Sequence, residues 1–511
     1  LGTGWLAGWL ASLTRDGLAG QPYEIPLLTQ AAAESLKLPP FGGEPMGELL
    51  MHGGLVATRI DGGQVLEDGA IRIGGDGRIA ALGSSAELAD EATRASFEGE
   101  VVDLGGRLVL PGQINAHHHL YSSLARGMAP LGSRPACDFV GVLETLWWPL
   151  DRALDEETVY LSALFGLMES VRAGVTTVVD HHASQGYVRG SLEALARAAR
   201  DLGVRLSTCF EVTDREGPSV AAAGLEENAA FAASLKDMEQ LGGAAQVAAS
   251  LGLHASFTLE EETLARAGRL LDEAGLPGVH VHLSEDRADT YDSLRRSGLR
   301  PTERLDGHGL LRPGSLTVHG LWVDDAEVAL LAERGCFVVT NPSSNMNNGV
   351  GRCDLARLRA GGVKVAVGTD GMSGDVLNSL ALAYFARRDS ARDPRVGWGD
   401  ALALLAGNRE VAEVFFPGAQ LGTLRVGGPA DLVVLDYLPF TPLNADNLLG
   451  HVLYGELASR TRDVICGGRY VLRGGQFPQL GEDFAELSRR AQRAAQSLWD
   501  RRSLKQSTPT E

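Results

Sequence analysis

Cysteine is sparse in this chain, and its spacing excludes two kinds of site. The sequence of 511 residues has five cysteines, namely Cys137, Cys209, Cys336, Cys353 and Cys466. None of them stands in a CxxC pair, which excludes a zinc ribbon and a thioredoxin-like motif. A small, odd and scattered set of cysteines is typical of a reducing compartment, so we expect a cytoplasmic protein.

The chain also lacks long apolar runs and an excess of positive charge. No run reaches 18 apolar residues, so we expect no membrane-spanning helix. The first charged residue is Arg15, whereas a secretory signal would need a cationic segment ahead of its apolar core. The formal net charge of -19 disfavours nucleic acid and anionic membranes as partners, because phosphate binding requires a basic face.

The middle of the sequence alternates between strand and helix patterns. Eight apolar, β-branched runs are spaced along it, at 112–117, 175–182, 204–211, 247–256, 278–285, 315–320, 335–341 and 363–370. Between them lie mostly stretches with helical periodicity, such as 156–174 and 190–203. Eight buried strands that alternate with helices predict an α/β protein with a TIM-like (β/α)8 barrel.

The flanks of this region have a different pattern. Residues 48–107 and the residues after about 418 contain short alternating strands separated by glycine and Asp-Gly turns. We expect the two flanks to build one small β-sandwich domain together. The predicted domains are an N-terminal extension (1–47), the first part of the sandwich (48–108), the barrel (109–414), the second part of the sandwich (415–478) and a C-terminal helix with its tail (479–511).

Histidines gather where the predicted strands end. Eight of the twelve histidines lie at or just after the C-terminal end of a predicted strand, namely His117, His118, His119, His181, His182, His254, His282 and His319. Active sites of such barrels are built at that face. His117 and His119 stand at i and i+2, so both side chains share one face of a strand and can bind one cation, whereas His118 must point away.

Other strand ends supply further candidates. His282 ends one apolar run and Asp370 ends another, where a carboxylate is costly unless a cation or hydrogen bonds compensate it. Glu285 lies three residues after His282, within reach of a bound water and a substrate. We expect His319 to steady the attacking water or the developing oxyanion. His280 points the same way as His282 but lies deeper in its strand, which we interpret as core packing.

Lysine is scarce as well, and this bears on the number of metal ions. The chain has four lysines, Lys37, Lys236, Lys364 and Lys505, and none of them ends a predicted barrel strand. A carboxylated lysine that bridges two metals is therefore not expected, and we predict one divalent cation. Histidine and carboxylate ligands suit both Zn2+ and Fe2+.

Several residues near the strand ends are candidates for substrate contacts, namely His254, His181, Asn345, Tyr121 and Trp148. An aromatic side chain can stack on a flat heterocycle. Packing in the core or in a lid over the site is the alternative for each of them.

Four segments in fixed order, "PGQINAHHH", "HVHLSE", "TVHG" and "GTDG", resemble the motifs of the amidohydrolase superfamily. The chain looks most similar to its branch of cytosine deaminases, guanine deaminases and Atz/Trz chlorohydrolases. The segments "LWWPLDRALDEE", "VVDHHAS" and "CFEVTDREG" look closest to the SsnA type of aminohydrolase, which is linked by resemblance to purine breakdown. The similarity covers roughly residues 49–500.

This resemblance implies roles for the residues that match its motifs. It implies that zinc or iron is bound by His117, His119, His282 and Asp370. It also implies that Glu285 and His319 do acid–base and positioning work, and that the protein forms a homodimer, as is common in that branch.

Together these observations favour a metal-dependent hydrolase that acts on a non-peptide C–N bond and deaminates a small, purine-like heterocycle. A cation held by three imidazoles and a carboxylate lowers the pKa of a water, and the hydroxide attacks the substrate. Glu285 then moves a proton from the water to a ring nitrogen or to the leaving nitrogen, and Asp370 accepts one as the intermediate collapses. Two alternatives stay open: a cyclic amidase that opens a purine-derived ring, and a non-catalytic metal-binding assembly partner.

Overall fold

The structure of the chain, a computed structural model, describes residues 47–132, 136–240, 246–480 and 484–504. The predicted N-terminal extension, 1–47, lies outside the described residues except for Gly47. Along the described ranges, no helix is both long and apolar enough to span a membrane.

Each of the eight apolar runs contains a β-strand, and neighbouring strands pair in parallel. One sheet contains β6 to β9 and a second contains β10 to β14. All side chains of β6 and β7 are buried, as expected of strands covered on both faces. The predicted α/β class with parallel strands is thus confirmed. The strands are β6 (Gln113–His118), β7 (Val175–Asp180), β8 (Arg205–Thr208), β9 (Val247–Ala249), β10 (Leu251–Ala255), β11 (Val279–Leu283), β12 (Leu316–His319), β13 (Phe337–Thr340) and β14 (Lys364–Val367).

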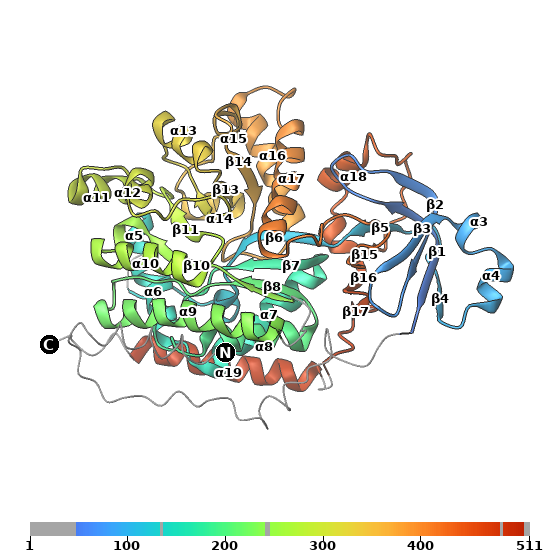
Figure 1. Ribbon diagram of the computed structural model, residues 1–511, viewed down its shortest axis with the longest axis horizontal. Coiled ribbons are helices and arrows are strands. Elements are labelled where there is room, and N and C mark those ends of the chain that lie inside the picture. The colour runs from blue at the N-terminus through green and yellow to red at the C-terminus, as the bar shows by residue number, and fades with distance from the viewer. Residues whose placement is uncertain (1–46, 133–135, 241–245, 481–483, 505–511) are drawn as a thin grey trace. The chain divides into compact units, whose positions relative to one another are not determined.

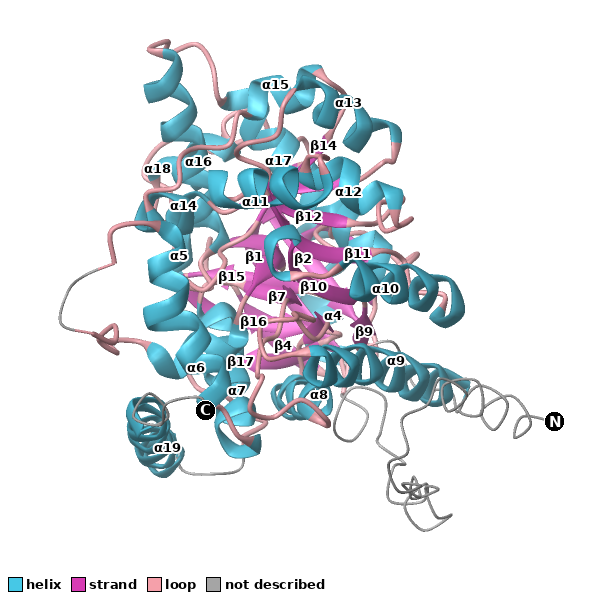
Figure 2. Ribbon diagram, turned by 90° about the vertical axis from the view of Figure 1, so that its left-hand side faces the viewer, coloured by secondary structure: helices cyan, strands magenta, loops and turns pink. Residues whose placement is uncertain are grey.

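Helices alternate with these strands and surround them (Figures 1 and 2). The helix α7 begins at a capping box, in which the Asp155 carboxylate accepts from the Thr158 N–H. The helix α8 ends at Leu202 and is capped by Gly203, whose φ of 84° suits glycine. The longer helices are α7 (Glu156–Arg172), α8 (Ser191–Leu202), α9 (Pro218–Gln240), α10 (Glu261–Ala274), α11 (Arg287–Ser297), α13 (Asp325–Glu333), α16 (Val376–Ala391) and α17 (Trp398–Phe415). Shorter ones are α5 (Phe139–Val142), α6 (Trp148–Ala153), α12 (Pro301–Gly307), α14 (Pro342–Asn348), α15 (Leu355–Ala360) and α18 (Leu448–Tyr454).

Within the predicted C-terminal segment 479–511, the described residues form the helix α19 (Phe484–Leu504). The helix lies against α6 and α7, where Arg490 donates to Glu157 at 2.9 Å and Arg501 donates to the carbonyl oxygen of Ala153 at 2.9 Å. Its charged residues therefore contact the helical layer as well as solvent.

The strands of the two flanks form one mixed sheet of eight strands. Its order is β17-β16-β15-β5-β1-β2-β3, and β4 pairs with β1. The antiparallel pairing of β15 with β5 joins the flanks, and apolar side chains from both, such as Met51, Val109 and Leu432, pack in a common core. The strands are β1 (Leu49–Ala57), β2 (Val65–Ile73), β3 (Ile79–Ser84), β4 (Glu100–Asp103), β5 (Leu108–Pro111), β15 (Leu432–Leu435), β16 (Thr461–Cys466) and β17 (Arg469–Leu472), and α3 (Ser85–Leu88) and α4 (Glu91–Ser96) follow β3.

The last central strand lies next to the first. The Thr369 N–H donates to the His117 carbonyl oxygen at 2.9 Å. Behind this contact, Asn408 of α17 donates to the carbonyl oxygens of Ile114 in β6 and Val367 in β14, at 2.7 and 2.9 Å. The C-terminal ends of β6 and β14 are thereby held side by side, and the candidate site lies there.

Candidate metal centre and active site

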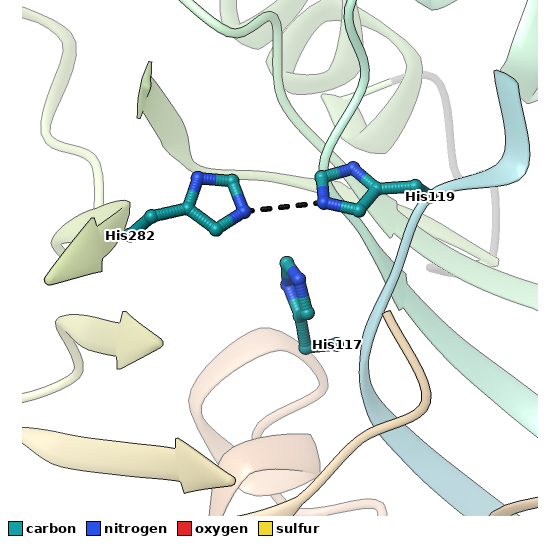
Figure 3. A group of neighbouring side chains, drawn as sticks. All are labelled: His117, His119 and His282. Carbon is teal, nitrogen blue, oxygen red and sulfur yellow. Dashed lines mark hydrogen bonds between the residues drawn. The ribbon is translucent and has the colours of Figure 1, made fainter. Parts of the chain in front are cut away.

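Four predicted metal ligands converge at the C-terminal ends of three strands. His117 lies in β6 and His119 follows it, while His282 lies in β11 and Asp370 follows β14. One nitrogen each of His117, His119 and His282 lies within 4.8 Å of the other two. Asp370 Oδ1 lies 3.3 Å from His119 Nε2 and 4.0 Å from His117 Nε2. Figure 3 shows the three rings turned toward one another.

The hydrogen bonds of these rings leave nitrogen lone pairs that face the centre. His119 Nδ1 lies 2.6 Å from the His181 carbonyl oxygen, and His282 Nδ1 lies 3.0 Å from that of His254. Because a carbonyl oxygen only accepts, both protons are assigned to Nδ1 and both Nε2 atoms carry lone pairs. These two Nε2 atoms lie 3.1 Å apart (Figure 3). In the described part of the chain, His117 Nε2 has no hydrogen-bond partner.

This arrangement fits a divalent cation. Two lone pairs that face each other at 3.1 Å repel unless a positive charge lies between them. Four ligand atoms at about 2.0–2.1 Å from a tetrahedral zinc ion lie about 3.3 Å from one another. The distances from His119 Nε2 to His282 Nε2 and to Asp370 Oδ1 are 3.1 and 3.3 Å. The donor set of three imidazoles and one carboxylate suits zinc and ferrous iron.

Burial keeps the candidate ligands in charge states that bind metal. Removal from water lowers the pKa of His117, His119 and His282, so their rings are neutral at physiological pH. Burial opposes ionisation of Asp370, but the neighbouring His119 and His319 outweigh it, and the pKa of Asp370 is lowered. Neutral imidazoles and an ionised carboxylate are the forms that coordinate a cation.

Glu285 and His319 lie beside Asp370. His319 Nε2 is 3.3 Å from Glu285 Oε2 and 3.6 Å from Asp370 Oδ2. Burial, and after it the charge of Asp370, raises the pKa of Glu285 well above its usual range. A carboxyl group in this state can carry a proton at neutral pH, as a general acid must.

The short helix α14 supports both of these groups. Asn345 Oδ1 lies 2.8 Å from His319 Nδ1, and Asn348 Nδ2 donates to Glu285 Oε1 at 3.4 Å. An amide oxygen accepts, so this contact assigns the His319 proton to Nδ1. Asn348 is not among the predicted site residues, although it belongs to the Asn-rich segment 343–348 of the sequence.

Three residues at this end of the sheets have left-handed backbone. The φ angle is 47° at Ser284, 74° at His319 and 56° at Asp370. Residues other than glycine rarely adopt positive φ, and such strain gathers at functional sites. The Asp289 carboxylate accepts from the Ser284 N–H at 2.9 Å and thereby holds the turn that carries Glu285.

A cavity that is open to solvent lies beside the candidate ligands. Four of the predicted metal-binding and catalytic residues line it, namely His119, His282, Glu285 and Asp370. Three of the predicted substrate contacts line it as well, namely Tyr121, Trp148 and His254. The other two lie behind the wall, where the carbonyl oxygen of His181 contacts His119 and the amide of Asn345 contacts His319.

The proton of His254 is fixed on the side away from the cavity. Its Nδ1 lies 2.7 Å from the Thr258 hydroxyl, which donates to the Ala255 carbonyl oxygen at 3.1 Å. The hydroxyl therefore accepts from His254 Nδ1–H, and Nε2 keeps a lone pair. His254 thus offers the cavity a hydrogen-bond acceptor.

A buried group of charged residues next to Trp148 was missed by sequence reasoning. Arg215 donates to Asp151 Oδ2 at 2.8 Å and lies 3.7 Å from Glu211 Oε1, and its guanidinium is 4.8 Å from the Trp148 ring centroid. Asp151 and Glu211 both line the cavity. Burial raises the pKa of Asp151 to about 7, against the opposing effect of Arg215. Glu211 ends an apolar run, which is the signal that had identified Asp370.

The chain is similar to known deaminases and hydrolases. Residues 108–471 match the model of the amidohydrolase family. A 5'-deoxyadenosine deaminase from Methanothermobacter thermautotrophicus is 31% identical over 443 residues, which cover 83% of this chain and 95% of that protein. An adenosine deaminase from Xanthomonas campestris, solved with bound zinc, is 25% identical with a TM-score of 0.74, covering 90% of this chain and 99% of that one. A triazine hydrolase from Arthobacter aurescens has a similar fold, with a TM-score of 0.72 at 22% identity, covering 89% of this chain and 99% of that one.

Proposed function

The chain belongs to the amidohydrolase family, and we propose that it is a metal-dependent aminohydrolase that removes an amino group from a purine-like heterocycle. The observation that carries the proposal is that nitrogens of three histidines and the Asp370 carboxylate lie close together beside a cavity. The similarity to a 5'-deoxyadenosine deaminase and to an adenosine deaminase supports an adenine-like substrate.

In this proposal, four residues hold one divalent cation, namely His117, His119, His282 and Asp370. Bound there, the cation would lower the pKa of an adjacent water and supply a nucleophile at neutral pH. Both zinc and ferrous iron suit the donor set, and the zinc in the similar adenosine deaminase favours zinc.

The chain's own side chains carry out the proton transfers. As the carboxylate, Glu285 takes a proton from the attacking water and passes it to a ring nitrogen of the substrate, and its raised pKa lets it hold that proton between the two transfers. His319 Nε2 keeps a lone pair and faces both Glu285 and Asp370, and from there it accepts a hydrogen bond from the attacking water and orients it. Asp370 takes the remaining proton of the added hydroxyl as the tetrahedral intermediate collapses and passes it to the amino nitrogen, which leaves as ammonia.

The heterocycle would lie between the acid–base residues and the aromatic wall. His254 Nε2 would accept from a ring or amino N–H of the substrate, because its own proton lies on Nδ1. Trp148 and Tyr121 offer aromatic faces to a flat ring. His181 and Asn345 would not touch the substrate themselves. They would hold His119 and His319, respectively, in position beside it.

A substrate screen tests this function. The protein, loaded with zinc or with ferrous iron, is incubated with purine-like amines, their nucleosides and cyclic amides, and released ammonia is measured. Ammonia from a purine-like amine is the expected result. Ring opening without ammonia would identify a cyclic amidase instead, and metal-replete protein that is inert toward the whole panel would favour a non-catalytic role.

We further propose that the two central sheets close into one (β/α)8 barrel over residues 109–414. Two observations support closure: the isolated parallel bridge between His118 and Asp370, and the bonds of Asn408 to both β6 and β14. The flank sheet would fold as a β-sandwich over 48–108 and 415–478, which the common core of both flanks supports. Residues 479–511 would follow as the C-terminal helix and tail.

We also propose that the protein is a homodimer in the cytoplasm. All five cysteines are free, which suits a reducing compartment. The dimer rests on the resemblance to a branch in which dimers are common, and light scattering during size-exclusion chromatography would measure the mass in solution.

A further inference from the structure

His280 contacts a candidate metal ligand from behind. Its Nε2 lies 2.8 Å from His117 Nδ1, and the two ring centroids are 5.0 Å apart with an angle of 70° between the rings. Both side chains are fully buried. His280 precedes His282 by two residues in β11, so the two rings project from the same face of the strand. The ring of His280 therefore lies in the layer directly behind the ligand set.

The proton positions in this pair follow from the role of His117. His117 can offer Nε2 to a cation only if its own proton is on Nδ1. That N–H points at His280 Nε2, which must then accept it with a lone pair. The proton of His280 is consequently on its Nδ1. In the opposite arrangement His280 donates, the proton of neutral His117 is on Nε2, and the ligand atom is blocked.

Packing alone does not account for an imidazole at this position. A polar group transferred into an apolar interior costs free energy unless hydrogen bonds compensate it. Within the described ranges, His280 Nδ1 has no hydrogen-bond partner, so the bond to His117 is what compensates the ring. An aliphatic side chain, such as those of Val279 and Val281 beside it in the strand, would fill the space without leaving a nitrogen unpaired.

We propose that His280 is a positioning residue of the metal centre, which accepts the His117 Nδ1 proton and thereby keeps His117 Nε2 free for the cation. The inference rests on the proposed function, because it takes His117 as a metal ligand. A hydrogen bond from the second nitrogen of a ligand histidine fixes the tautomer and the ring orientation and raises the basicity of the ligand. At His119 and His282 a main-chain carbonyl oxygen serves this purpose, and at His117 a neutral ring does so.

The test compares zinc affinity in three variants and the wild type. His280→Leu removes the acceptor and keeps an apolar side chain, whereas His280→Gln keeps an acceptor oxygen near the position of Nε2. His182→Leu is the matched control, because it removes another fully buried histidine at the same end of the sheets, one that bonds to Ser184 instead of a ligand. Zinc dissociation constants are measured by competition with a chromogenic chelator, and thermal unfolding of the metal-free proteins reports on folding.

His280→Leu is expected to weaken zinc binding by about 10–100-fold. His280→Gln and His182→Leu are expected to bind zinc nearly as tightly as the wild type. The inference is overturned if His280→Leu retains wild-type affinity, or if either of the other two variants weakens binding as much as His280→Leu does. Should His280→Leu not fold, His280→Met replaces it, since a thioether is a weak acceptor.

These outcomes are separable from those of the proposed function, because turnover is not part of the measurement. A selective loss of zinc affinity in His280→Leu upholds the inference even if no tested heterocycle is deaminated. Failure of the wild-type protein to bind zinc would overturn both.

Discussion

The Nε2 atoms of His119 and His282 lie 3.1 Å apart, and the Nδ1 atom of each ring faces a main-chain carbonyl oxygen. Neither ring can turn its proton toward the other without giving up that bond. Since both side chains are buried and carried by β-strands or their ends, the two rings have little freedom to move apart. The fold thus holds two lone pairs against each other, and a cation between them relieves the repulsion.

Removal of one ligand should release the metal. Asp370→Ala takes away the carboxylate of the proposed set, so the purified variant should contain far less zinc than the wild type in elemental analysis. His308→Ala is the control, because His308 bonds to Glu261 at the protein surface and has no part in the site. Full zinc occupancy in Asp370→Ala would exclude Asp370 as a ligand.

Glu285→Gln should keep the metal and lose most of its turnover. Glutamine preserves the size of the side chain but cannot carry the proton, and general acid–base catalysis contributes about 10²–10⁴-fold to rate. The measurement is kcat for ammonia release, with zinc content determined on the same preparation. Glu262→Gln, on the exposed face of α10, controls for the loss of a negative charge. If Glu285→Gln turns over at the rate of Glu262→Gln, Glu285 has no role in proton transfer.

Asn345→Leu should slow the reaction through His319. Without the amide oxygen, the His319 proton is free to move between its two nitrogens, and loss of such a supporting contact costs about 10–100-fold in activity. Zinc content should stay at the wild-type level, because His319 is outside the proposed ligand set. Met346→Ala, at an exposed neighbouring position of α14, is the control. Loss of zinc from Asn345→Leu would show that the residue acts on the metal centre as a whole.

Asp151 should make stability depend on pH. Burial raises its pKa from 3.8 to about 7, so the folded chain binds this proton more tightly than the unfolded chain does. Binding of this proton therefore stabilises the folded chain fully below the unfolded pKa of 3.8, and the contribution is lost as the pH rises through about 7. Asp151→Asn lacks the titrating group and should lack this loss.

Urea unfolding of the two proteins across this pH range measures the effect. The free energy of unfolding of the wild type, relative to that of Asp151→Asn, should fall with rising pH by at most about 1.4 kcal/mol per pH unit. Loss of the ion pair between Arg215 and Asp151 in the variant shifts the whole difference but not its slope, because a guanidinium does not titrate in this range. If the difference in unfolding free energy between the two proteins is independent of pH, or if it shifts in favour of the wild type as the pH rises, the raised pKa of Asp151 is contradicted.

The strands, and the place where the candidate metal ligands lie, could be predicted because both leave local signals. A strand buried on both faces appears as a continuous apolar run, and every such run in the middle of the chain contains a strand. A polar residue at the end of a run stands out, as His282 and Asp370 do. The i and i+2 spacing predicted that His118 points away, and its Nδ1 does contact the main-chain oxygen of Asp370, at 2.7 Å.

Contacts between distant loops leave no such signal. His280 and His117 are 163 positions apart, and strand periodicity predicts the face on which a ring lies but not its partner. Arg215 follows a strand in a short turn, where charged residues are usually solvated, yet the fold buries it against Asp151. In the flanks, alternation predicted the strands, but the order in which β15 joins β5 depends on long-range pairing.

Anomalous diffraction at the zinc absorption edge, from crystals of the zinc-loaded protein, tests the central claim most directly. We expect one strong peak about 2.0–2.1 Å from His119 Nε2 and from His282 Nε2, with His117 Nε2 and the Asp370 carboxylate completing its coordination. The absence of a peak there, or a peak elsewhere with these four side chains uncoordinated, would contradict it.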